Sequence, residues 1–305
     1  MVLNSLICNG QKPWSVKSCF LLSDCGVAPL NTKIVGGVNA SAGSWPWQVS
    51  IRYQGAHICG GTLISDHHFL SAYIVQNRNT RRINICKVFT RNVSKTIVNS
   101  NYNNTLFNND IALMQLSNPI TFNNYIRPIC LAGNSSQFYS STPCWATGWG
   151  RLGKPLAAYN ILQEVQIPVV GPKECSCDYT QEVNITDQMI ITALSPLQGD
   201  SGGPLQCKQG SVWVQAGITS FGPQPCALAG YPSVFARVSA FQSWITNQVS
   251  GSNVSFVTFN STGVNQDNSY VCVPQNVTAS AASVGVTAFT LAAISVNMIL
   301  SLEYF

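Results

Sequence analysis

The stretch Gly199-Asp200-Ser201-Gly202-Gly203-Pro204 is the most informative part of this sequence. Glycines on both sides of a serine allow a tight turn that exposes the hydroxyl and directs backbone N–H groups at one point. Such a turn is how an oxyanion hole, which stabilises negative charge on a reacting carbonyl oxygen, is built. Taken alone, the stretch is also compatible with a glycine-rich turn that has no catalytic role. Other parts of the sequence are needed to distinguish the two interpretations.

The chain around this stretch has the pattern of short strands. Between Ile34 and about Val238, short apolar or alternating runs are broken by Gly, Pro, Asn and Ser. This spacing predicts an all-β barrel or sandwich. Only the last element, Val238–Val249, has apolar residues at helical spacing and is predicted to be a helix. The clearest strand candidates are Trp47–Arg52, Gly61–Ser65, Ile111–Leu116, Glu164–Val170 and Val212–Ile218.

The composition excludes several classes of protein. Of 305 residues, 46% are hydrophobic and 9% are charged, which excludes a disordered acidic or basic protein. The net charge of +5 comes from 16 basic residues that form no basic run, which argues against nucleic-acid binding. Twelve cysteines indicate an oxidising compartment.

Asn-x-Ser/Thr sequons support the same compartment. Together with the cysteines they indicate a secreted glycoprotein, the alternative being an Asn-rich surface on which few sites are used. The sequons begin at Asn39, Asn92, Asn103, Asn134, Asn184, Asn253, Asn260 and Asn276.

The two ends of the chain differ from its body. A secretion signal needs an apolar core of about 7–15 residues, and residues 1–24 offer only Cys19-Phe20-Leu21-Leu22, yet secretion is still expected from the rest of the chain. The expected organisation is a leader and propeptide at 1–33, a folded domain at 34–249, a glycosylated stalk at 250–283 and a hydrophobic tail at 284–305.

The hydrophobic tail predicts attachment to a membrane. Val284–Leu302 carries no charge, and no Lys, Arg or His follows Arg237. A membrane-spanning helix usually has basic residues on its cytoplasmic side, whereas small residues before an apolar end, here Ser280, Ala281 and Ala282, are typical of a GPI-attachment signal. A GPI anchor is therefore favoured over a simple membrane span or a buried segment.

Further short stretches occur in one known order along the chain, and together with Gly199–Pro204 they resemble the trypsin-like serine proteases of the chymotrypsin fold. The resemblance covers about Cys25 to Val249. Because of its tail, the chain looks most like the membrane-anchored prostasin- or testisin-like group. The stretches are Lys33-Ile34-Val35-Gly36-Gly37, Trp45-Pro46-Trp47-Gln48-Val49, Cys59-Gly60-Gly61-Thr62-Leu63-Ile64, Asn109-Asp110-Ile111-Ala112-Leu113, Arg127-Pro128-Ile129-Cys130-Leu131 and Thr147-Gly148-Trp149-Gly150.

The resemblance implies a fold and a set of residue roles. The fold would be two six-stranded antiparallel Greek-key β-barrels followed by a C-terminal α-helix. Ser201 matches the nucleophile, Asp110 matches the aspartate that orients the base, and the amides of Gly199 and Ser201 match the oxyanion hole.

The resemblance also implies a zymogen. Lys33-Ile34 matches the activation bond, and the new amino group of Ile34 would pair with Asp200 after cleavage. Disulfides Cys25–Cys130 and Cys144–Cys207 are implied, while Cys8, Cys19, Cys86, Cys177 and Cys272 have no assignable role. Protein or peptide substrates and a protease inhibitor are the expected partners, with no cofactor and no metal.

The chain departs from the family where the general base belongs. The family has a histidine followed by a cysteine, and this chain has Ile74 and Val75. Isoleucine cannot accept the proton of a serine hydroxyl, which is a weak nucleophile until that proton is taken. His57 precedes the matching strand, and His67 and His68 stand seven and six residues too early, about 20 Å along a strand.

The specificity pocket departs as well. Residues of the loop before Ser201, including two cysteines, are missing relative to the family, and Ser195 stands where trypsin-like members place an aspartate. Ser233 replaces a wall glycine, and Ser220 and Gly222 complete the expected pocket. A preference for Lys or Arg side chains is therefore not supported.

Two hypotheses remain open at this point. The chain is either a secreted serine endopeptidase whose printed sequence is a mis-spliced or mis-assembled version of an active enzyme, or a pseudoprotease that uses the fold to bind a partner. The intact Ser201 and Asp110 support the first, and Ile74 with the altered pocket supports the second.

Overall fold

The protein is represented by a computed structural model, which describes residues 25–31, 38–73, 82–85, 89–103, 107–150, 161–178, 185–193, 200–221, 233–249 and 251–271. By its internal contacts the chain divides into two units, Met1–Cys272 and Val273–Phe305, and every described residue belongs to the first.

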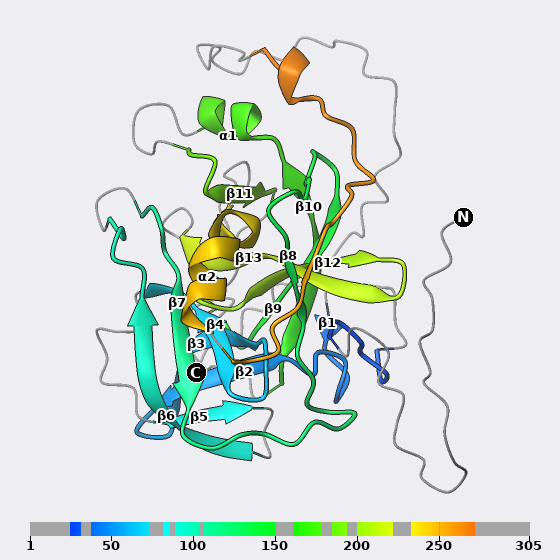
Figure 1. Cartoon of the computed structure of the whole chain (residues 1–305). Helices are drawn as coiled ribbons and strands as arrows, with labels where there is room; N and C mark the ends of the chain where they lie inside the picture. The colour runs from blue at the N-terminus through cyan, green and yellow to red at the C-terminus, as the bar shows by residue number, and fades with distance from the viewer. Residues whose placement is uncertain are drawn as a thin grey trace, which may run out of the picture. The chain divides into compact units, whose positions relative to one another are not determined.

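Six strands form a closed barrel in the first half of the described chain, in the order β2-β3-β4-β7-β6-β5 (Figure 1). The pairing of β2 with β5 closes the barrel. Along β2, Val49 and Ile51 are fully buried and belong to the core, and the intervening Ser50 lies on the other face. The strands are β2 (Gln48–Tyr53), β3 (Ala56–Leu63), β4 (His68–Ser71), β5 (Arg82–Ile85), β6 (Phe89–Val98) and β7 (Ala112–Leu116).

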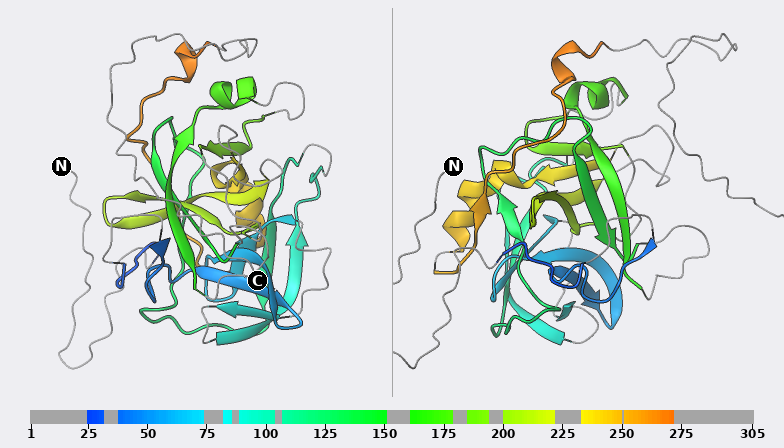
Figure 2. Two further views of the ribbon diagram at one scale, coloured as in Figure 1. Left: turned by 180° about the vertical axis from the view of Figure 1, so that it is seen from behind. Right: turned by 90° about the vertical axis from the view of Figure 1, so that its right-hand side faces the viewer.

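A second sheet of nine strands, counted within the described residues, forms the other barrel-like layer (Figure 2). Its antiparallel part runs in the order β12-β9-β10-β11-β14-β13, and β12 also pairs with β13. The strands are β1 (Val38–Asn39), β8 (Cys130–Ala132), β9 (Pro143–Gly148), β10 (Gln163–Val170), β11 (Met189–Thr192), β12 (Pro204–Gln209), β13 (Val212–Phe221), β14 (Ser233–Arg237) and β15 (Phe256–Val257).

The predicted all-β class with two barrel-like sheets is confirmed, but within the described residues the second sheet has nine strands instead of six, because β8 and β15 add parallel pairings to it and β1 pairs with β10. The helices differ as well. The expected helix begins as a 3-10 turn, η2 (Val238–Phe241), and continues as α2 (Gln242–Gln248). Val238 and Phe241 are both buried, and their three-residue spacing suits a 3-10 turn, in which such residues stand above one another. Two further short helices, α1 (Pro172–Asp178) and η3 (Asp267–Ser269), were not predicted.

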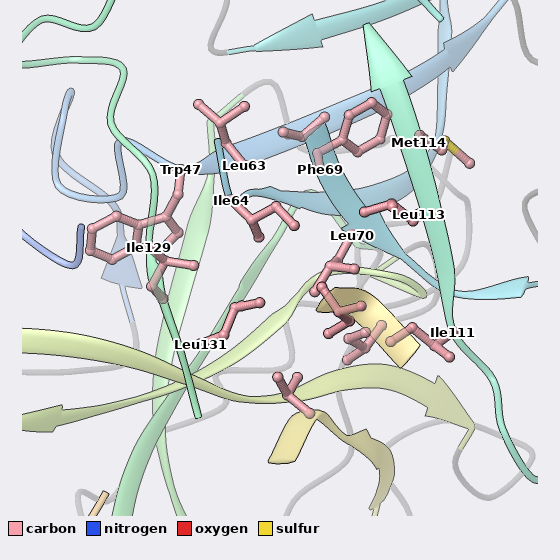
Figure 3. Packing of buried hydrophobic residues seen from close by; sticks show 14 of the residues in the cluster. Trp47, Leu63, Ile64, Phe69, Leu70, Ile111, Leu113, Met114, Ile129 and Leu131 are labelled. Atoms are coloured by element: carbon pink, nitrogen blue, oxygen red, sulfur yellow. The ribbon is translucent and has the colours of Figure 1, made fainter. Parts of the chain in front are cut away.

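The main hydrophobic cluster takes side chains from both barrels (Figure 3). Hydrogen bonds between buried polar side chains also join the two barrels. Trp47 Nε1 donates to Gln206 Oε1 across the two sheets, and Gln206 Nε2 donates to Thr147 Oγ1 at 3.1 Å. Thr147 Oγ1 in turn donates to Gln48 Oε1 at 2.6 Å. Because a buried polar group is costly unless it is paired, this chain of bonds favours one arrangement of the barrels over others.

Both disulfides that the resemblance implies, Cys25–Cys130 and Cys144–Cys207, are present in the structure. A segment expected to be part of the stalk is packed instead. Residues 251–271, which we call the strap, lie along the second sheet and contribute β15 to it, paired in parallel with β8. The remainder of the expected stalk, and the hydrophobic tail, lie outside the described residues.

Candidate functional site

The turn that carries Ser201 depends on its glycines. Gly202 has φ +83°, the left-handed region that favours glycine, and a Cβ atom there would overlap Ser71 Oγ. The Gly60 amide donates to the Ser201 carbonyl at 2.9 Å, and the Gly203 amide donates to the Asp200 carbonyl at 2.8 Å. The first bond holds the turn against β3 and the second closes the turn, and Ser201 itself is half-buried.

The Asp110 carboxylate lies buried two residues before β7 begins and is held from two sides. The Tyr73 amide donates to Oδ1 at 2.6 Å, and the Ser220 hydroxyl donates to Oδ2 at 2.5 Å. The preceding Asn109 has φ +59°, a conformation that asparagine tolerates better than most residues. These two hydrogen bonds therefore fix the orientation of the Asp110 carboxylate without a contribution from a catalytic base.

Two short connections bring Ser201 and Asp110 into one site, although they are far apart in sequence. On β13, Thr219 accepts the Gly202 amide at 2.8 Å, and the next residue, Ser220, binds Asp110. On β4, Ser71 Oγ donates to the Gly60 carbonyl at 2.8 Å, and Tyr73 follows two residues later. Position 74 directly follows the residue whose amide holds Asp110.

Asp200 is also buried, next to a motif that the sequence singled out. Its Oδ1 accepts the Gly150 amide at 2.7 Å, and a Cβ atom on Gly148 would overlap the same carboxylate. In the motif Thr147–Gly150, Gly148 thus allows the Asp200 carboxylate to approach the backbone closely, and Gly150 supplies an amide that donates to this carboxylate.

Two tyrosines lie beside Asp110, and sequence reasoning did not find this pair. The rings of Tyr73 and Tyr102 stack with centroids 3.9 Å apart and planes inclined by 13°. Burial, first of all, raises the pKa of Tyr102, and the charges of Asp110 and Tyr73 raise it further. Tyr102 therefore stays protonated near neutral pH and cannot act as the missing base.

All three histidines of the chain are described, and each is engaged away from Asp110. His57 Nδ1 lies 2.8 Å from Ser50 Oγ, and its ring packs against Trp149. His67 Nδ1 lies 2.9 Å from an Asp66 carboxylate oxygen.

The third histidine, His68, binds hydroxyls at the far end of β4. Its Nδ1 lies 3.3 Å from Ser65 Oγ and 3.1 Å from Ser252 Oγ. Burial, and then the neighbouring His67, lower the pKa of His68 while Asp66 opposes them. From His68 to Tyr73, β4 and the residues after it extend over about 16 Å.

The specificity pocket is described only in part. Ser233 is fully buried on β14, and its hydroxyl has no hydrogen-bond partner among the described residues. Ser220 binds Asp110, as above. The other expected site positions, Lys33, Ile34, Ile74, Val75, Ser195, Gly199 and Gly222, lie outside the described residues.

The described residues contain no group of three or more His, Cys, Asp or Glu side chains that could hold a metal ion. The arrangement that they do form is a serine on a glycine turn, bridged to a buried and oriented aspartate. The trypsin family model matches residues 34–245, more than half of the chain. The chain therefore belongs to the trypsin-like serine protease family.

Proposed function

We propose that this chain is a secreted serine endopeptidase homologue that hydrolyses peptides negligibly in the form printed here. The observation that carries the proposal is Ile74 at the position next to the amide that holds Asp110. Removing the histidine of such a triad costs roughly 10⁶-fold in turnover. None of the three histidines is placed to substitute, and Tyr102 stays protonated.

A turnover measurement tests this proposal. Trypsin treatment is expected to cut the Lys33–Ile34 bond, and N-terminal sequencing should then begin at Ile34. The cleaved protein should neither turn over peptide substrates nor label rapidly at Ser201 with a fluorophosphonate. Turnover of about 1 s⁻¹ or more, the ordinary range of enzymes, would refute the proposal.

A second candidate, a pseudoprotease that binds a partner, is favoured by the same substitution. The Ser201 turn and the Asp110 carboxylate are held in place without a base, so a peptide or a protease inhibitor could be bound without being cleaved. Protease inhibitors that bind in this site are the appropriate probes. Saturable binding that Ser201→Trp abolishes would support this candidate.

The protein is also proposed to be a glycosylated protein of the cell surface. The trypsin-like domain and its disulfides fit an extracellular, secreted protein. The described residues contain no helix that is long and apolar enough to cross a membrane. The described sequon asparagines are all exposed, as attachment of a glycan requires, and are Asn39, Asn92, Asn103, Asn134, Asn253 and Asn260.

Phosphatidylinositol-specific phospholipase C should release the protein from the surface of expressing cells. The reason is the uncharged Val284–Leu302 tail without a basic flank, which is typical of a GPI signal. The measurement is the amount of protein in the medium before and after lipase, with a protein anchored by a spanning helix as control. Full retention after lipase treatment would favour a membrane span.

A further inference from the structure

The strap, residues 251–271, begins beside a buried histidine of the first barrel. It follows α2 after a short connection (Figure 1), and Gly251 at its start has φ +89°. The next residue, Ser252, places its hydroxyl oxygen 3.1 Å from His68 Nδ1 on β4. His68 is 6% exposed and takes no part in the candidate site. This contact therefore joins the first barrel to a segment whose later part lies along the second sheet.

The hydrogen bonds of Ser65 decide where the proton of the His68 ring lies. Ser65 Oγ accepts the amides of His67 at 3.2 Å and of His68 at 3.0 Å. A hydroxyl can accept two hydrogen bonds and donate one. Towards His68 Nδ1, which is 3.3 Å away, Ser65 can therefore only donate. It follows that Nδ1 is an acceptor and that the neutral ring carries its proton on Nε2.

The Ser252 hydroxyl meets the same acceptor. Because Nδ1 has no proton to give, Ser252 Oγ donates to it. The backbone around Ser252 is also ordered, since its amide donates to the Val249 carbonyl at 2.9 Å and its carbonyl accepts the Val254 amide at 3.0 Å. The start of the strap is thus fastened to β4 through a hydrogen bond that uses the neutral form of the imidazole.

The titratable neighbours of His68 on its own turn are His67 and Asp66. Burial first, and then the nearby His67, lower the pKa of His68, while Asp66 opposes them. The Asp66 carboxylate lies 2.9 Å from His67 Nδ1, so it is directed to the other imidazole. A proton on His68 would therefore be a poorly compensated charge in a buried position.

Other parts of the chain bring no countercharge to the His68 ring. Strand β7, helix α2 and the strap before Asp267 contain no Lys, Arg, His, Asp or Glu, and the first charged residue after β7 is a cation, Arg127. Strand β3 holds His57 and Cys59. Both lie at least five residues, about 16 Å along a strand, from Ile64, whose amide donates to the His68 carbonyl.

We propose that His68 is a pH-sensitive fastening of the strap, closed while the imidazole is neutral and loosened when acid protonates it. On acidification the lone pair of Nδ1 takes a proton from water and becomes an N–H donor, so both hydroxyls lose their acceptor. Ser65 Oγ cannot accept the new N–H group because it already accepts two amides. With the start of the strap lifted, the charged ring meets water, so protonation shifts the population towards the lifted arrangement.

The direction of the pH effect follows from burial. A ring exposed to water takes up a proton near pH 6.5, whereas the buried ring of His68 does so at a lower pH. The closed arrangement therefore has its full stability above about pH 6.5 and loses stability as the pH falls below that value. This behaviour does not depend on whether Ile74 abolishes catalysis.

Hydrogen exchange of the full chain at pH 7.4 and pH 5.5, corrected for the intrinsic rate at each pH, tests the fastening. The amides of Ser252 and Val254, both hydrogen-bonded in the closed arrangement, are followed by mass spectrometry, with β13 as the reference for global stability. We expect their protection to fall several-fold at pH 5.5, up to the limit of about tenfold for one proton taken up near pH 6.5. Equal or greater protection at pH 5.5 would overturn the proposal.

Three variants assign the effect to His68. His68→Asn keeps an acceptor on a short side chain but cannot be protonated, so its protection should be the same at both pH values. Ser252→Ala leaves the barrel intact and should lower protection at pH 7.4 towards the value that the parent has at pH 5.5. His67→Asn, the matched control at an imidazole whose side chain is 38% exposed, should keep the pH dependence of the parent. Persistence of that dependence in His68→Asn, or unchanged protection in Ser252→Ala, would contradict the assignment.

Discussion

The variant Ile74→His is expected to increase the rate of Ser201 labelling by a fluorophosphonate at least 100-fold over the parent, both after cleavage at Lys33–Ile34. Asp110 is already held by Tyr73 and Ser220, so a histidine at position 74 would meet an oriented carboxylate. Loss of such a base costs roughly 10⁶-fold, which leaves room for a large gain. Labelling should rise with pH as the imidazole loses its proton near pH 6.5.

Peptide turnover by Ile74→His should recover far less than labelling. Turnover also requires a substrate side chain placed in the pocket, and misplacement by about 1 Å can cost 100-fold. Ile74→Gln, which has a similar size but no basic nitrogen, is the matched control and should stay at the parent rate. Adding Ser201→Ala to Ile74→His should abolish labelling. A gain no larger than that of Ile74→Gln would mean that Asp110 and Ser201 are not arranged to use a base.

The site was predictable from sequence to the extent that local motifs carry it. The glycines around Ser201 predicted a tight turn, and the structure has φ above zero at Gly202. Asp110 was identified through the resemblance, and the positive φ of the preceding Asn109 was not predicted. What the motifs could not give is the connection between them. Thr219 and Ser220 make that connection from adjacent positions of β13, and a Thr-Ser pair within an apolar strand has no pattern that predicts it.

The fold was predictable where hydrophobic periodicity is strong. Four of the named runs, Trp47–Arg52, Ile111–Leu116, Glu164–Val170 and Val212–Ile218, overlap β2, β7, β10 and β13 nearly throughout, and Gly61–Ser65 overlaps the end of β3. Helix α1 was missed because its sequence has no apolar stripe, and among its residues 172–176, whose side chains are described, only Cys175 is buried.

The strap was missed for a related reason. Residues 250–283 are rich in Ser, Asn, Val and Thr, and this composition was interpreted as a stalk. The docking uses backbone groups, which every residue has, one buried aromatic ring, and the side-chain oxygens of Ser261 and Asp267, which accept the Tyr139 and Lys173 amides. The Phe259 amide donates to Ser136 Oγ at 2.9 Å, and its carbonyl accepts the Gln137 amide at 2.9 Å. Neither bond depends on the type of residue at 259, so no sequence pattern signals them.

Replacing Phe259 by alanine is expected to lower the free energy of unfolding by about 3–5 kcal/mol, the usual cost of a Phe→Ala change in a core. The side chain is 2% exposed, and the stacked contact with Phe138 is lost together with the buried area. For a domain of this size the midpoint of thermal unfolding should fall by about 6–20 °C. Both backbone hydrogen bonds of residue 259 can still form in the variant, so the change in the free energy of unfolding reports the loss of the aromatic ring.

Val264→Ala is the matched control, because this residue belongs to the same strap and its side chain is 65% exposed. Its effect should stay within about 0.5 kcal/mol, as for most surface substitutions. A single, shifted transition for Phe259→Ala would mean that the strap unfolds together with the barrels. Equal midpoints for the two variants would mean that the strap comes off before the barrels unfold and adds nothing to their stability. In that case the segment from 251 onward would act as a tether, as its composition first indicated.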